Sequence, residues 1–249
     1  MNKSALICEG STDYVLLQYY MIKALEWKDD PSIQGKYKLK IPGQKYRSLI
    51  KNDNILTIMA CGGCSRLMEG LQTVLNKNKL TPPDMSDLYS KIVIITDRDE
   101  ADTEGKMIES VKHELDLMDA TYTEEIQAND WIEVQMRSQM GMIEKIKILL
   151  LVIPFEERGA METFLLQTIS ASDPYEKQLI DDCISFVDTV DSEKRYLVSR
   201  RHITKAKFDT YFSVRTPVEQ FVQRQSILKN VPWEQYTKIQ EDFSKLEEI

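Results

Sequence analysis

The chain has 249 residues, with 32 Lys and Arg residues against 40 Asp and Glu residues and a formal net charge of −8. This length suits one large domain or one domain with an appendage, and 42% hydrophobic residues are enough for a packed core. The acid excess excludes a protein that coats nucleic acid by bulk positive charge alone. No apolar run approaches the ~20 residues that span a bilayer, and the apolar start of the chain is interrupted at Glu9. We therefore expect a cytoplasmic protein without a membrane segment or signal peptide.

Strand and helix patterns alternate over the first 170 residues. Short apolar runs predict strands at 4–8, 55–59, 92–95, 131–138 and 146–153. Helical spacing predicts a helix with Ser11 or Thr12 as its N-cap and others at about 66–75, 103–117 and 159–168. Residues 26–54, punctuated by Pro and Gly, are predicted as a loop-rich insertion. This alternation predicts an α/β fold with a mostly parallel central sheet flanked by helices.

The C-terminal part of the chain carries helix signals only. Asp173-Pro174, Thr216-Pro217 and Val231-Pro232 resemble helix starts, and no strand pattern follows residue 172. We therefore predict an α/β domain over residues 1–172 and a helical appendage over 173–249.

The four cysteines are Cys8, Cys61, Cys64 and Cys183. Cys61-Gly-Gly-Cys64 has the spacing of a zinc ligand pair or a redox dithiol, but no second pair accompanies it. Reduced thiols in a reducing compartment are the favoured interpretation.

Carboxylates follow two predicted central strands. Glu9 ends the first strand, Asp13 lies one helical turn later, and Asp97 and Asp99 end the third. Ligands of an open parallel sheet collect at the carboxyl ends of its strands. Four carboxylates gathered there would repel one another unless a hard divalent cation neutralised them. Alternatively, Glu9 and Asp13 complement a helix N-terminus, and Asp97 and Asp99 belong to a solvated loop.

These segments carry a family resemblance. Glu9-Gly10-Ser11-Thr12-Asp13 and Asp97-Arg98-Asp99 resemble the two signature motifs of the Toprim domain, in the form found in its nuclease branch. Gly62-Gly63 is similar to a glycine turn after the second strand, and Gly159-Ala160-Met161-Glu162 resembles the glycine-x-x-glutamate element of small Toprim proteins and overcoming-lysogenization-defect (OLD) nucleases. The resemblance covers about residues 3–170, with an insertion at 26–54 that is longer than expected.

The resemblance implies a metal centre and its residues. It implies one or two Mg²⁺ or Mn²⁺ ions held by Glu9, Asp13, Asp97, Asp99 and Glu162, with Glu9, Asp97 and Asp99 also catalytic. In OLD nucleases a lysine downstream of the acidic motifs assists the transition state, and by position Lys205 or Lys207 is the counterpart. Two residues apart on a helix, these lysines cannot share one face.

Positive charge is concentrated in two segments. Residues 1–60 carry nine basic and six acidic side chains, and residues 191–229 carry nine and four. Phosphate contacts come chiefly from Lys and Arg, so these segments are candidates for nucleic-acid binding, against the alternative of a solvated charged face. The candidate contacts are Lys38, Lys40, Lys45, Arg47, Arg200, Arg201 and Lys205.

The resemblance therefore predicts a divalent-metal-dependent nuclease that cleaves phosphodiester bonds in DNA or RNA. A stand-alone Toprim protein with a helical tail also resembles effectors of bacterial anti-phage defence that work with a separate ATPase; this chain has no P-loop consensus of its own. The alternatives are an RNA-maturation nuclease, or a catalytically idle Toprim fold that binds a partner protein. A homodimer stays open.

Overall fold

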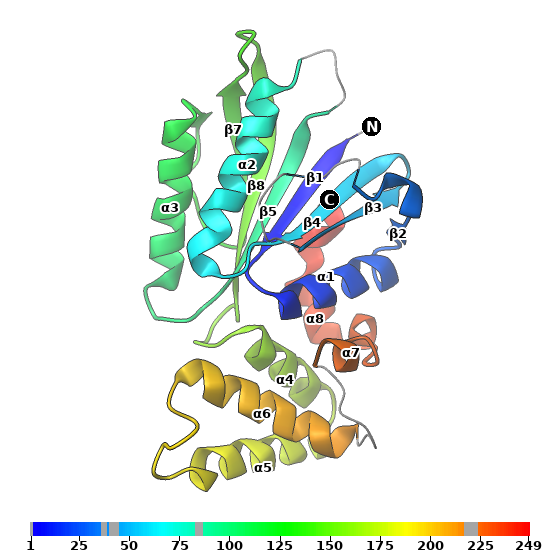
Figure 1. Ribbon diagram of the computed structural model, residues 1–249, viewed down its shortest axis with the longest axis vertical. Helices are drawn as coiled ribbons and strands as arrows, with labels where there is room; N and C mark the ends of the chain where they lie inside the picture. Colours follow the sequence, from blue (N-terminus) through cyan, green and yellow to red (C-terminus); the bar gives the residue numbers. More distant parts are fainter. Residues whose placement is uncertain (1, 36–38, 40–44, 83–86, 217–223) are drawn as a thin grey trace.

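The computed structural model describes residues 2–35, 39, 45–82, 87–216 and 224–249. Its centre is an eight-stranded sheet with the order β2-β3-β4-β1-β5-β8-β7-β6 (Figure 1). The four central strands are parallel to one another: β4 (Asn54–Ala60), β1 (Lys3–Cys8), β5 (Tyr89–Asp97) and β8 (Ile143–Ile153). The edges are antiparallel additions: β2 (Lys28–Asp29), β3 (Lys45–Lys51), β7 (Trp131–Arg137) and β6 (Thr121–Tyr122). The predicted α/β fold with a mostly parallel central sheet is confirmed.

The central strands are apolar on both faces because helices cover both faces. Along β1, Leu6 and Cys8 enter one hydrophobic cluster, whereas Ala5 and Ile7 enter the other. This split follows from the two-residue period of a strand. Continuous apolar runs are therefore typical of these strands, as the sequence indicated.

The helices form two layers and a group beyond the sheet. α2 (Leu67–Leu80) and α3 (Thr103–Leu117) pack on one face, and α1 (Ser11–Lys23) packs on the other. α4 (Met161–Ser172), α5 (Pro174–Val190) and α6 (Arg200–Arg215) lie together beyond the carboxyl ends of the parallel strands (Figure 1). The helix predicted at 103–117 is confirmed, and the one predicted at 159–168 begins at Met161.

The last helical segments return to the sheet. α7 (Arg224–Leu228), η3 (Trp233–Gln235), α8 (Thr237–Asp242) and η4 (Ser244–Glu248) contribute to the same hydrophobic cluster as α1 and β1. Trp233 is fully buried, and its indole N–H donates to the carbonyl of Leu228 at 2.7 Å. The described part of residues 173–249 is helical and shares its core with the sheet domain.

Two expectations from the sequence are wrong. The described part of the segment 26–54 is not mainly loop, because β3 lies within it and pairs with β4 along seven residues as an antiparallel hairpin. Charged residues at positions 45, 47 and 51 leave β3 without a long apolar run. The first helix is also capped differently: Gly10 is the N-cap, and the Asp13 carboxylate accepts the Gly10 N–H at 2.9 Å. Within the described residues, no helix combines the length and apolarity needed to cross a membrane.

Close packing of α2 on the sheet predicts a sharp effect of one methyl group. A Cβ at Gly70 would lie 2.8 Å from Cys61 Sγ and 2.9 Å from Ile7 Cγ2. We expect Gly70→Ala to destabilise the protein by about 1–3 kcal/mol through overpacking, measured by urea unfolding. Gly105→Ala on α3 is the matched control, because nothing lies within 4 Å of its Cβ. That variant should be neutral or more stable; equal effects at both positions would contradict this account of the packing.

Candidate functional site

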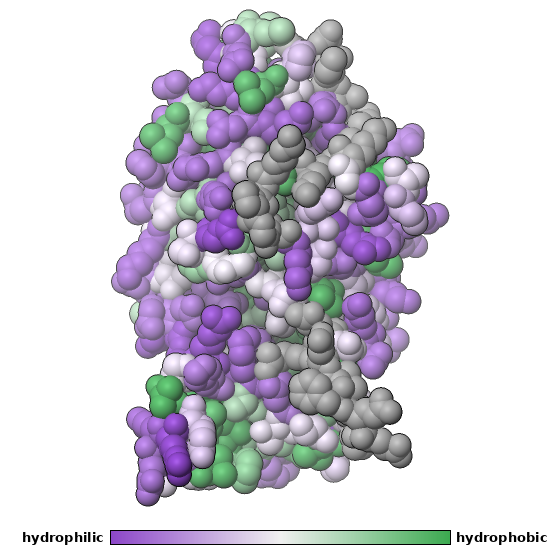
Figure 2. Space-filling view, in the orientation of Figure 1, coloured by the Kyte–Doolittle hydropathy of each residue, from purple (hydrophilic) through white to green (hydrophobic). Residues whose placement is uncertain are grey.

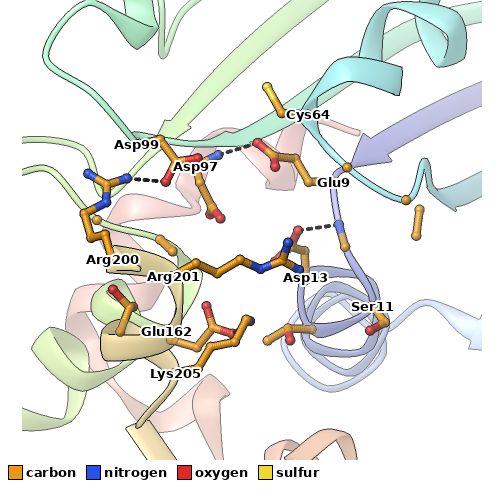
Figure 3. A pocket seen from close by; sticks show the side chains of 18 of the residues that line it. Glu9, Ser11, Asp13, Cys64, Asp97, Asp99, Glu162, Arg200, Arg201 and Lys205 are labelled. Atoms are coloured by element: carbon orange, nitrogen blue, oxygen red, sulfur yellow. Dashed lines mark hydrogen bonds and ion pairs between the residues drawn. The ribbon is translucent and has the colours of Figure 1, made fainter. Parts of the chain in front are cut away.

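One pocket of about 510 Å³ lies between the carboxyl ends of the central strands and the helices α4 and α6 (Figure 3). Most of the predicted site residues line it. These are Glu9, Asp13, Lys45, Asp97, Asp99, Glu162, Arg200, Arg201 and Lys205. They come from five elements and the turns beside them, so the fold gathers residues that are up to about 200 positions apart.

Glu9 is fixed by the turn between β1 and α1. Its side-chain Oε1 accepts the Thr96 hydroxyl at 2.6 Å and the Asp97 backbone N–H at 3.0 Å. Its backbone carbonyl accepts the N–H groups of Gly62 and Gly63 at 2.8 and 2.9 Å. Both glycines have positive φ, 86° and 139°, which side chains disfavour, so the glycine pair is required where the chain turns toward Glu9.

Asp97 is the last residue of β5, and it links the sheet to α4. One carboxylate oxygen accepts the Met161 N–H at 2.9 Å, in the first turn of α4. Arg98 points away from the pocket, donating to the carbonyls of Pro154 and Phe155 and pairing with Glu104 at 2.8 Å. Arg98 therefore ties the end of β5 to the segment after β8.

Burial and mutual repulsion shift the acidic side chains. Burial raises the pKa of Asp13 to about 6, with added contributions from the charges of Glu9 and Glu162. Burial also raises the pKa of Asp97 well above its usual range, as do the charges of Asp13 and Glu9. The pKa of Glu9 is raised by burial, which outweighs its hydrogen bonds to Thr96 and Asp97. These shifts indicate a cluster with more negative charge than its surroundings balance.

Cations from α6 face these acids. Lys205 Nζ donates to Glu162 Oε1 at 2.5 Å, and the Glu162 side chain is only 4% exposed. Arg200 pairs with Asp99, whose side chain is 57% exposed at the pocket rim. Arg201 extends between Asp13 and Asp97 in Figure 3, and its charge lowers the pKa of Glu9.

Other predicted residues lie elsewhere. Lys207 pairs with Asp188 on α5 at 2.8 Å and does not line the pocket, because two residues along a helix turn a side chain to another face. Arg47 pairs with Asp29 on the neighbouring strand β2 and is not among the lining residues. Lys38 and Lys40 lie outside the described residues.

Sequence reasoning missed two lining or supporting residues. Thr96 orients Glu9, and its position directly before Asp97 at a strand end was the available signal. Cys64 also lines the pocket, and burial followed by the charge of Glu9 raises the pKa of its thiol. All four cysteines are unpaired thiols, as the composition indicated.

A divalent cation fits the chemistry of these donors. Glu9, Asp13, Asp97 and Glu162 offer carboxylate oxygens, which Mg²⁺ and Mn²⁺ prefer. Burial, and to a lesser extent neighbouring carboxylates, raises the pKa values of Glu9, Asp13 and Asp97. Among the described residues, no group of three His, Cys, Asp or Glu side chains already converges on one point as a metal site would. Each carboxylate instead engages a backbone N–H, a hydroxyl or Lys205, so joint coordination would need side-chain rotations.

One protein-family model matches nearly the whole chain. The family model described as "Protein of unknown function (DUF3226)" matches residues 3–245. The chain belongs to this family. The match spans both the sheet domain and the C-terminal helices, so the pocket and the helix α6 lie within the family's extent.

Solved structures show the fold of this DUF3226 chain. The hypothetical protein PH0156 from Pyrococcus horikoshii OT3 is similar over 100% of this chain and 99% of its own, with 15% identity and a TM-score of 0.54. At this identity the likeness concerns the fold alone. A glyoxalase/bleomycin resistance protein/dioxygenase family enzyme from Burkholderia phytofirmans PsJN matches with 11% identity over 60% of this chain and 98% of its own, but its TM-score of 0.20 carries no argument. No curated protein matches the chain.

Asp13 gives the stability a defined pH dependence. Its pKa is about 6 in the folded state against an ordinary 3.8, so between these values the folded state binds more protons than the unfolded state. Stability from this group therefore falls as pH rises through about 6. Asp13→Asn removes the charge and keeps an oxygen that can accept the Gly10 N–H.

In EDTA at about pH 8, we expect Asp13→Asn to melt several degrees above the wild type, and the difference to vanish near pH 4. Calorimetry across this pH range measures it. Asp30→Asn is the control: Asp30 is exposed and its pKa is lowered by its hydrogen bonds to Ser32, so that variant should not gain stability. A melting temperature of Asp13→Asn at or below that of the wild type at pH 8 would refute the assigned repulsion.

Proposed function

We propose that this protein is a Toprim-like, divalent-metal-dependent nuclease that hydrolyses phosphodiester bonds. One observation carries the proposal: half-buried carboxylates at the carboxyl ends of β1 and β5, and buried ones in the first turns of α1 and α4, face cations from a single helix, α6. Phosphoryl-transfer enzymes typically bind metal through carboxylates and bind phosphate through nearby cationic side chains. The order of the acidic motifs along the chain also supports a Toprim-like arrangement.

The buried acids are the proposed metal ligands. Glu9, Asp13, Asp97 and Glu162 would hold one or two Mg²⁺ or Mn²⁺ ions, with Asp99 joining from the rim. Bound metal would supply an activated water and charge stabilisation at the phosphoryl group. Thr96 and the Asp97 N–H keep Glu9 oriented, and the Met161 N–H does the same for Asp97.

The arginines of α6 are the proposed phosphate contacts. Arg200 Nη1 is buried and has no hydrogen-bond partner among the described residues, although its other Nη pairs with Asp99. The Arg200 side chain is 39% exposed and lines the pocket, so the accessible part of its guanidinium is suited to a phosphate oxygen. Arg201 and Lys45 line the same pocket, so a backbone phosphate would meet positive charge from two sides.

Lys205 is the proposed catalytic lysine. It bonds Glu162 within the pocket, whereas Lys207 bonds Asp188 outside it. When Glu162 binds metal, the Lys205 ammonium can turn to the phosphoryl oxygens, where negative charge develops during cleavage. The proposal includes DNA or RNA as the substrate. It also includes a role in anti-phage defence together with a separate ATPase.

Asp97 gives the first test of the proposal. We expect Asp97→Asn and Asp97→Ala to lower Mn²⁺-dependent cleavage of a DNA and RNA panel by at least about 100-fold, because both remove a ligand at the centre of the cluster. Asp102→Asn is the control, since Asp102 pairs with Lys106 on the surface of α3. Full cleavage by the Asp97 variants would place the active site elsewhere. Absence of cleavage by the wild type with Mg²⁺ or Mn²⁺, alone and with a partner ATPase, would favour the idle binding module.

The two lysines form a matched pair for the second test. Lys205→Gln should lower the single-turnover cleavage rate by about 100- to 1,000-fold while binding of oligonucleotide changes little. Lys207→Gln, two residues away on the same helix, should cleave at the wild-type rate. Equal rates for the two variants would remove Lys205 from the mechanism, and circular dichroism verifies that both are folded.

A further inference from the structure

The connection between α5 and α6 is held by one carboxylate. Asp191 accepts three consecutive backbone N–H groups, from Arg195 at 2.9 Å, Tyr196 at 2.8 Å and Leu197 at 2.7 Å. These bonds lower the pKa of Asp191, and Lys194 completes the turn with a φ of 52°. The backbone here is therefore ordered by hydrogen bonds and does not depend on burying the side chain of Tyr196.

Tyr196 stands out from this fixed turn into solvent. It is 71% exposed, and the Arg195 guanidinium lies 5.5 Å from its ring centroid. The chain then runs directly into α6, where Ser199 caps the helix by accepting the His202 N–H at 3.2 Å. Arg200 and Arg201, at the start of α6, line the acidic pocket, so only three residues of chain separate Tyr196 from the pocket's cationic side.

We propose that Arg195 and Tyr196 form a stacking platform for an unpaired base of single-stranded nucleic acid entering the acidic pocket. This inference rests on the proposed nuclease function and deepens it by naming the substrate class. An aromatic face beside cations that follow the phosphate backbone is the general means of binding single strands. Arg195 adds a cation–π contact that orients the ring.

The geometry favours unpaired bases over a duplex. In a duplex the faces of internal bases are covered by neighbouring pairs, so only an unpaired or splayed base can lie on the Tyr196 ring. Arg200 lies four residues further along, lines the pocket and is partly exposed, so its guanidinium is suited to the adjacent phosphate. Tyr196 would then stack on the base, and Arg200, at the start of α6, would contact the phosphate next to it.

Tyr175 is another exposed ring at this end of the molecule. Figure 2 shows hydrophobic patches among hydrophilic side chains around α5 and α6. Tyr175 is 74% exposed, but it begins α5 at the end opposite to Asp191, and it is not a pocket residue. Tyr175 is therefore a matched control for Tyr196.

Binding of fluorescent oligothymidine and oligouridine, as single strands and as duplexes with their complements, tests the platform. The measurement uses fluorescence anisotropy with Ca²⁺ in place of Mn²⁺. We expect Tyr196→Ala to weaken single-strand binding by about 5- to 150-fold, and Tyr196→Phe, which keeps the ring, by less than about two-fold. Tyr175→Ala should bind as the wild type does, and duplex binding should be equal for all variants.

Three results would overturn the platform. One is unchanged single-strand binding by Tyr196→Ala, and another is an equal loss on single strands and duplexes. The third is a change in oligomeric state of Tyr196→Ala with unchanged oligonucleotide binding, which would make the ring a protein contact. If the wild type cleaves nucleic acid and any of these occurs, the platform alone fails. If the wild type neither binds nor cleaves any oligonucleotide, the proposed nuclease function fails with it.

Discussion

Burial of carboxylates beside one another is the constraint on which the site depends. Asp13 and Asp97 are held at the carboxyl edge of the sheet, where burial and neighbouring acids raise their pKa values. A fold selected for stability alone would replace such groups by neutral side chains. The surrounding structure instead fixes them with backbone N–H groups from Gly10 and Met161. This arrangement stores unfavourable charge at one place and is the physical basis for expecting a cationic ligand.

Cationic side chains of the helix α6 form ion pairs with part of the acidic cluster. Lys205 reaches the buried Glu162, and Arg200 reaches Asp99 at the rim, so the cations of α6 face acids that come from the strand ends and from α1 and α4. Metal and phosphate could then be bound side by side between them. The excess negative charge of the whole chain does not argue against the proposed function, because Lys45, Arg200, Arg201 and Lys205 are gathered at the pocket.

The sequence could predict the sheet and most acids because these depend on local patterns. Apolar runs revealed the buried strands, and Glu9 and Asp97 follow two of them directly. The hairpin strand β3 was not recognised, since Lys45, Arg47 and Lys51 leave it only the short apolar run Leu49-Ile50. Choosing Lys205 over Lys207 needed the packing of α6 against α4 and α5, which no local pattern contains. The sequence did not single out Tyr196, because its role is inferred from the three backbone hydrogen bonds that Asp191 accepts and from the pocket residues that follow it on α6.

Calorimetric titration with Mn²⁺ tests the central claim most directly, because it measures metal binding without any substrate. The account predicts that the wild type binds one or two ions, that affinity rises as pH increases through about 6, and that Asp97→Asn loses most of the binding. Absence of Mn²⁺ binding by the wild type, or equal binding by Asp97→Asn, would contradict a metal centre at the carboxyl edge of this sheet.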